Sequence, residues 1–292
     1  MASLSAPGAP SAPAAAAPTP RSPAPGAAPA ARFGRYGRRL ALVFGLPAVL
    51  VAAWWIVSES ADNLFFPPLS EILSEFGPTW FDGRLVDDVL PSLGRLAAGY
   101  ALALVLGVAL GILIGTWPSL RALAEPVLEF FRAIPPPVLV PILMLFLGID
   151  TTMKVVVIAS GAVWPVLLNT VEGVRGIDGL LRDTARVYRL RPLTRLRTVV
   201  LRGASPQIVT GARQALSIAI VLMVISEMFA ANNGLGFSIV QFQRGFALPE
   251  MWTGIILLGL VGLLLSLIFR AVERAVLAWY RGQRQAQRGG NR

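Results

Sequence analysis

The chain has 292 residues, of which 55% are hydrophobic and 14% are charged, whereas soluble domains carry about 25% charged residues, so the composition indicates an integral membrane protein. The net charge of +10 comes almost wholly from Arg in the tails and in one internal stretch, a distribution that argues against nucleic-acid binding. The absence of Cys and His excludes disulfides, Cys or His metal ligands, and nucleophile pairs that need either residue.

The N-terminal region divides into a tail and a first apolar segment. Residues 1–31 are almost entirely Ala, Pro, Ser and Gly, which bury too little apolar surface to order the chain, so we predict a disordered cytoplasmic tail. Residues 32–61 hold a basic flank and then the apolar run 40–57, which at about 1.5 Å per residue is long enough to cross a bilayer. Trp54 and Trp55 fit an interfacial belt at the end of this run. The alternative is a cleaved signal peptide.

An acidic stretch and a second apolar segment follow. Residues 62–88 carry six carboxylates and a single Arg, which marks them as an extracytoplasmic loop. In the span predicted over 93–115, Gly107, Gly111 and Gly115 recur every four residues and share one helix face, on which a neighbouring helix can approach closely. Helix packing is the expected role of these glycines, and a substrate-facing groove is the alternative.

Proline shapes the third apolar segment, residues 123–147. The three consecutive prolines at 135–137 cannot continue a regular helix, because proline lacks the backbone N–H and clashes with the preceding turn. We predict an amphipathic approach along the inner surface, a break at the prolines, and a span over 138–147. The fourth span is predicted over 153–170.

Two further spans, over 208–230 and 251–269, complete a membrane domain that we place at 89–273. The tail 274–292 is basic, and the loop between these two spans carries a single Arg. Arg is therefore concentrated on one side of the membrane at every loop. The positive-inside rule then predicts an all-α bundle of about six transmembrane helices with the N and C termini in the cytoplasm.

A few polar and aromatic side chains lie inside or beside the predicted spans. Glu227 stands near the outer end of the fifth span, where an intramembrane carboxylate is a functional candidate and an interfacial carboxylate capped by polar neighbours is the equal alternative. Trp164, Asn169 and Asn232 are the other candidates for a translocation path or gate, with interhelix hydrogen bonding or packing as the alternative role. The chain has no P-loop, so any ATP that is used is hydrolysed by a partner.

A basic stretch, residues 172–207, interrupts the apolar pattern between the fourth and fifth spans. It holds eight Arg residues against three carboxylates, which places it in the cytoplasm. Leu and Val residues supply apolar faces along it, and Pro192 disfavours the α conformation at Arg191, so we predict two helical pieces. A projecting helical pair with an apolar face indicates insertion into a groove on another protein. A solvated loop that contacts anionic lipid is the alternative.

Residues 66–274 resemble a known family through an ordered series of motifs. The series includes SLGRLAAGYALALVLGVALGILIG, PVLEFFRAIPPPVLVPILMLFLGID, WPVLLNTVEGVRGID and TGARQALSIAIVLMVISEMFAANNGLGFSIV. It is similar to the membrane subunits of bacterial ATP-binding-cassette (ABC) importers of the nitrate, sulfonate and taurine type. The resemblance implies a type I, MetI-like permease bundle in the cell inner membrane, which carries a small anion.

The same resemblance implies partners and a role for the basic stretch. Two ATPase subunits, which bind ATP and Mg²⁺, would bind the stretch as a coupling loop. A second permease copy or a paralogue would complete the translocation path, and a solute-binding protein would deliver substrate on the outer side. The coupling signature of the family is Glu-Ala-Ala, then Gly, and later Leu-Pro. Its positions are occupied here by Asp183, Thr184 and Ala185, then Arg189, then Leu201-Arg202. Arg186 belongs to the same surface, and Pro192 is expected to supply the break that the missing Gly would make.

The sequence thus predicts a transport subunit with no bond chemistry, metal site or bound cofactor of its own. A secondary transporter is the alternative, which needs membrane carboxylates or a broken-helix ion site; Glu227 is the one residue that qualifies. A membrane enzyme is disfavoured because Cys, His and clustered intramembrane acids are absent. Arg95 and Arg213 lie near span ends, where snorkelling to the interface is as good an interpretation as an anion path.

Overall fold

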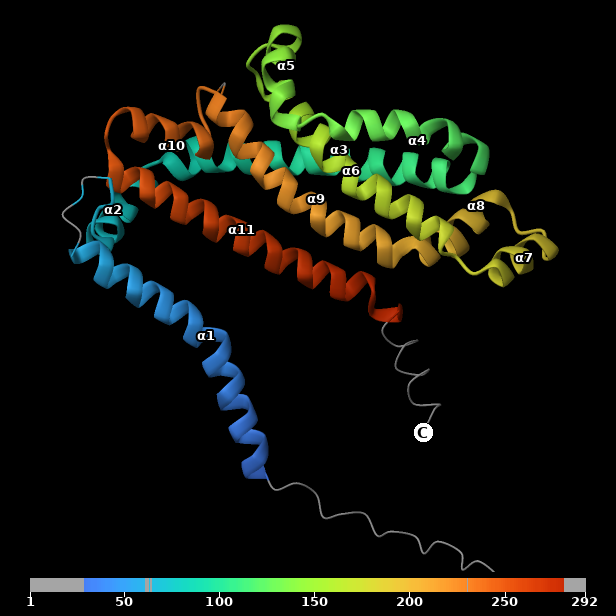
Figure 1. Cartoon of the computed structure of the whole chain (residues 1–292), viewed down its shortest axis with the longest axis horizontal. Helices are drawn as coiled ribbons and strands as arrows, with labels where there is room; N and C mark the ends of the chain where they lie inside the picture. The colour runs from blue at the N-terminus through green and yellow to red at the C-terminus, as the bar shows by residue number, and fades with distance from the viewer. Residues whose placement is uncertain (1–28, 61–62, 64, 230, 281–292) are drawn as a thin grey trace, which may run out of the picture. The chain divides into compact units, whose positions relative to one another are not determined.

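The computed structural model describes residues 29–60, 63, 65–229 and 231–280, with side chains described from residue 45 onward. Within these residues every regular element is helical, which confirms the all-α prediction (Figure 1). The predicted tail 1–31 lies outside the described residues except at its end, where helix α1 (Pro29–Ser60) already begins. The chain divides between Trp54 and Trp55 into two units, and the described helices from residue 69 onward belong to the second.

Within the described chain, the helices that are long and apolar enough to cross a membrane lie over the predicted segments, and one of them begins earlier than predicted. Four stretches are long and apolar enough to cross a membrane: Leu85–Thr116, Thr151–Arg175, Pro192–Phe229 and Leu248–Val276. A bent pair of apolar helices, Pro118–Ala133 with Pro136–Leu147, meets at 72° and has the composition of a broken span or a re-entrant loop (Figure 1). The part of the first predicted span that is described here, Gly45–Ser60, is a shorter apolar helix.

Proline explains the bend in this helix pair. Helix α4 (Pro118–Ala133) stops before Pro135, which is extended, and a single 3-10 turn, η2 (Pro136–Val138), leads into α5 (Leu139–Leu147). Because three successive residues lack an N–H group, the hydrogen bonds of α4 cannot continue through them. The predicted break is confirmed, and the segment predicted behind it forms the helix α5.

The core of the bundle consists of α3 (Leu90–Thr116), α6 (Thr151–Arg175) and α9 (Leu201–Phe229). On α3, the glycines at four-residue spacing lie against α6, where Gly107, Gly111 and Gly115 face Val166, Thr170 and Val174 in turn. Both series step by four residues in the same direction, so α3 and α6 run parallel. A Cβ added at Gly111 would lie 2.5 Å from the Thr170 Cβ, so only a residue without a side chain allows this approach.

Both predicted extracytoplasmic loops contain helical structure. The elements are α2 (Leu69–Phe81), the π-helical turn η1 (Leu85–Val89), α10 (Leu235–Arg244) and, after it, α11 (Leu248–Val276). Trp80 of α2 is fully buried. Its ring packs edge-on against Phe242 of α10, with 6.3 Å between the ring centroids, and its Nε1 donates to Thr253 Oγ1 of α11 at 2.9 Å. These contacts join α2, α10 and α11 into one layer.

The basic stretch forms two helical pieces, as predicted, but the second does not stand apart. The first is α7 (Gly179–Val187), and the second, α8 (Pro192–Arg195), passes through the π-helical turn η3 (Leu196–Val200) directly into α9. The fifth span therefore begins at Pro192, well before the predicted start at residue 208. Pro192 occupies the first turn of α8. Backbone N–H groups in the first turn have no acceptor within the helix, so the missing N–H of proline costs no hydrogen bond there.

Candidate functional site

Helix α7 is fixed at both ends by local hydrogen bonds. At its start, the Asp178 carboxylate accepts from the Leu180 N–H at 2.9 Å. At its end, the Leu190 N–H donates to the Ala185 carbonyl at 3.1 Å and the Arg189 N–H donates to the Arg186 carbonyl at 3.0 Å. This pair of bonds is the Schellman motif, which needs a left-handed residue after the helix.

Arg189 is that left-handed residue, with a φ of 48°. The signature that the sequence resembles is expected to have Gly at this position, and Gly adopts positive φ without steric cost. Pro192 was expected to supply the break; the break instead starts three residues earlier, at Arg189, and Pro192 begins the next helix. Arg189 therefore carries the strain of a conformation that ordinary residues avoid by roughly 1–2 kcal/mol.

One face of α7 attaches it to the bundle. Ala185 is buried in a cluster that also contains Val174, Ile177, Val199, Val200 and Ala204. The Arg182 guanidinium donates to the carbonyls of Val174 (2.6 Å) and Arg175 (2.8 Å), at the end of α6. Small size at residue 185 is thus required for α7 to lie against α6 and the start of α9.

The other face of α7 is open. Leu180, Val187 and Tyr188 expose 75%, 79% and 76% of their surface, an unusual degree for large apolar side chains. Asp183 and Arg186 are also exposed, and they pair with each other at 3.2 Å. The Thr184 hydroxyl donates to the Leu180 carbonyl within the helix, and Leu201 lies outside α7, at the first residue of α9.

The four residues predicted for a translocation path do not form one cluster. Trp164 and Asn169 lie half-buried on α6, and the Asn169 amide donates to the Pro165 carbonyl (2.8 Å) and to Gln214 Oε1 of α9 (3.3 Å). Asn232 is exposed in the turn before α10, whereas Glu227 is fully buried. Among the described residues, no hydrogen bond joins any two of these four side chains.

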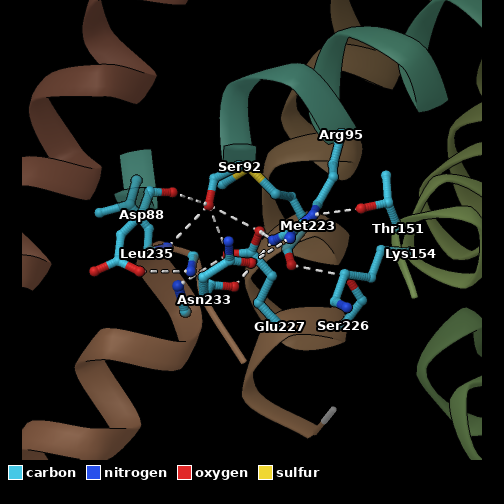
Figure 2. Close-up of polar contacts among 12 residues, drawn as sticks. Asp88, Ser92, Arg95, Thr151, Lys154, Met223, Ser226, Glu227, Asn233 and Leu235 are labelled. Atoms are coloured by element: carbon cyan, nitrogen blue, oxygen red, sulfur yellow. Dashed lines mark hydrogen bonds and ion pairs between the residues drawn. The ribbon is translucent and has the colours of Figure 1, made fainter. Parts of the chain in front are cut away.

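Glu227 of α9 forms an ion pair with Arg95 of α3, shown in Figure 2, at 2.8 Å between Oε1 and Nη1. The two side chains expose 0% and 7% of their surface, so Arg95 does not snorkel to the interface. The Ser92 hydroxyl, 2.8 Å from both carboxylate oxygens, also donates to Glu227. Sequence reasoning treated the two residues separately. The signal that joins them is opposite charge at similar depth in two apolar spans.

Two other basic side chains differ in burial. Lys154, the only lysine, is buried on α6, and its Nζ donates to the Ile149 carbonyl at 2.6 Å. Arg213 of α9 is half-exposed and pairs with Glu273 of α11. Because Arg213 has a carboxylate partner on another helix, its position is set by an interhelix ion pair and not by snorkelling alone.

Comparison with known proteins agrees with this architecture. Residues 103–281 match the family described as "Binding-protein-dependent transport system inner membrane component". The taurine transport system permease protein TauC of Escherichia coli is 30% identical, over 83% of this chain and 91% of the relative. The bicarbonate transport system permease protein CmpB of Synechocystis is 32% identical, over 77% of this chain and 84% of the relative.

A solved structure shows the same fold. The inward-facing MetNI methionine ABC transporter aligns with a TM-score of 0.57 at 24% identity, over 67% of this chain and 97% of the matched chain. The family match covers more than half of the sequence and all of the core helices from the middle of α3 onward. The chain is therefore a member of the binding-protein-dependent transport system inner membrane component family, the multi-pass permease subunits of ABC importers.

Proposed function

We propose that this chain forms the translocation path of an ATP-driven importer and couples to a separate ATPase through residues 172–207. The observation that carries the proposal is the two-faced α7. One face is fixed to the bundle through Ala185, and the other presents Leu180, Val187 and Tyr188 to solvent. A short amphipathic helix with an open apolar face is suited to a groove on another protein.

The chemistry of the relatives supports a small anion as the solute. One relative is named for taurine and another for bicarbonate. A solute-binding protein delivers this anion to the outer face, and a second copy of the chain or a paralogue completes the path. The concentration of Arg in residues 172–207 and in the C-terminal tail supports cytoplasmic termini. ATP and Mg²⁺ are bound by the ATPase partner.

The surroundings of Glu227 bear on the alternative, an ion-coupled secondary transporter. Such a transporter needs a carboxylate that can exchange protons or cations during its cycle. Glu227 instead accepts hydrogen bonds from Arg95, Ser92 and the Gly236 N–H. The two oxygens of this carboxylate are thus occupied by donors of the chain itself, one of them a guanidinium, as expected for a structural contact between helices, which favours the ATP-driven function.

A charge-swap experiment tests the docking claim. Asp183→Lys combined with Arg186→Glu keeps the pair on α7 but reverses the charges that face a partner, and like charges across an interface cost several kcal/mol. We expect the detergent-purified variant to lose at least about ten-fold in affinity for its cognate ATPase, or about 1.4 kcal/mol. The matched control is Glu129→Lys with Arg132→Glu, an exposed pair of the same spacing on α4. Equal ATPase binding by the two variants would contradict docking on α7.

A further inference from the structure

Helix α10 has no N-terminal cap of its own. Its N-cap residue is Gly234, which has no side chain to accept a hydrogen bond. The first N–H groups instead donate to side chains of three other elements. The Gly234 N–H donates to Asp88 Oδ1 of η1 at 2.9 Å, the Leu235 N–H to Ser92 Oγ of α3 at 2.9 Å, and the Gly236 N–H to Glu227 Oε2 of α9 at 3.0 Å. The cap therefore exists only when η1, α3 and α9 are together.

Arg95 holds this shared cap in place. Its Nη1 donates to Glu227 Oε1 at 2.8 Å and to the Asn233 carbonyl at 3.0 Å, and its Nη2 donates to Asn233 Oδ1 at 2.5 Å. Figure 2 shows the guanidinium between Glu227 and the turn that precedes α10. One side chain of α3 thus fixes both the carboxylate that caps α10 and the residue before the cap.

The backbone leaves little freedom at this junction. Gly234 has a φ of 127°, and a Cβ there would lie 2.5 Å from the Glu227 carboxyl carbon. A Cβ at Gly236 would lie 2.5 Å from the Val224 carbonyl oxygen. The start of α10 is therefore in direct contact with the last turns of α9 and depends on both glycines.

The opposite face of α10 joins the outer layer. Leu235 and Phe242 pack with Trp80 of α2 and Val89 of η1 in one buried cluster. Further inward, α11 stands off from α3 and α9 along an apolar groove of about 560 Å³. At the outer end, α10 consequently joins α2 and α11 to α9, while Val89 of η1 and Leu93 of α3 link the same cluster to α3.

We propose that Arg95 and Glu227 are a positioning pair that holds α10 against the core helices. Through this contact, the outer layer formed by α2, α10 and α11 moves together with the outer ends of α3 and α9. The pair is neither an anion site nor an ion-coupling carboxylate. Its consequence for transport rests on the proposed function: a solute-binding protein that presses on the outer layer would act on α3 and α9 through this junction.

Hydrogen exchange measured on the purified full-length chain tests the structural part. Arg95→Met with Glu227→Leu replaces the buried ion pair by apolar side chains, a change that buried pairs often tolerate without loss of stability. The Gly236 N–H then has no acceptor, so we expect the amides of residues 234–238 to exchange at least ten-fold faster, while a cooperative thermal transition shows that the rest of the chain is still folded. Glu273→Gln is the control, because it breaks the exposed Arg213–Glu273 pair without touching α10.

The outcomes separate this inference from the proposed function. Unchanged exchange of residues 234–238 in the double variant, or equally fast exchange in Glu273→Gln, would overturn the positioning role, whether or not an ATPase docks on α7. If the double variant does not fold, Arg95→Lys tests the guanidinium alone, since it keeps the charge and the Glu227 acceptor but lacks the planar fork that donates to Glu227 and Asn233. Faster exchange of residues 234–238 is again expected, and unchanged exchange would overturn the positioning role of Arg95. In the assembled importer, the variant that loosens α10 should keep its basal ATP hydrolysis and lose the stimulation by binding protein; retained stimulation would contradict the transport consequence.

Discussion

Replacing Gly111 by Ala tests the close packing of α3 on α6. The added Cβ would lie 2.5 Å from the Thr170 Cβ and 2.9 Å from the Leu167 carbonyl oxygen, whereas carbon atoms in contact prefer about 3.5–4.0 Å. Neither neighbour is the flexible end of a side chain, so the two helices must separate by about 1 Å to relieve the clash. Overpacking of this kind costs about 1–3 kcal/mol.

Gly94 of α3 provides the matched control, because a Cβ there would meet nothing within 4 Å. Gly94→Ala gains the helix propensity of Ala, about 1 kcal/mol, without a clash, so the difference between the two variants isolates the cost of packing. Thermal unfolding of the detergent-purified chain, followed by circular dichroism, is the assay. We expect a lower midpoint for Gly111→Ala than for Gly94→Ala, and equal midpoints would refute the backbone-to-backbone interface.

Two further changes test single contacts. Arg189→Gly should stabilise the end of α7 by roughly 0.5–1 kcal/mol, because the relief of left-handed strain exceeds the entropy cost of Gly. Hydrogen exchange at the Leu190 amide should therefore slow, and faster exchange would contradict the presence of strain at Arg189. Thr253→Val should lower the free energy of unfolding by about 1–3 kcal/mol, since it leaves the buried Trp80 N–H without its acceptor. Thr253→Ser keeps the acceptor, so a thermal midpoint of Thr253→Ser as low as that of Thr253→Val would argue against the bond.

Much of the fold could be predicted because membrane insertion leaves strong marks on a sequence. These marks are local in the chain. The apolar runs and the Arg asymmetry predict the spans and their order, and the prolines at 135–137 predict the bend. The start of the fifth span was misplaced because hydropathy marks where a helix enters lipid. It does not mark where the helix begins, and α9 continues back through η3 and α8 to Pro192.

The parts that could not be predicted depend on contacts between distant residues. Arg95 and Glu227 are far apart in the chain, and neither residue alone distinguishes a buried pair from a snorkelling or interfacial charge. The short helix α10 has no capping side chain in its own sequence, and its hydrogen-bond acceptors come from other elements, so no local pattern marks its start. The break at Arg189 was missed because its left-handed backbone is set by the Schellman bonds, and Arg gives no sign of that conformation.

Uptake by proteoliposomes tests the central claim most directly. The chain would be reconstituted with its cognate ATPase and binding protein, and uptake would be measured for the solute that co-purifies with that binding protein. An ATP-driven permease predicts uptake that requires hydrolysable ATP on the ATPase side and continues after ionophores have collapsed the proton and sodium gradients. Uptake that persists without the ATPase and stops with the ionophores would contradict the account and identify a secondary transporter.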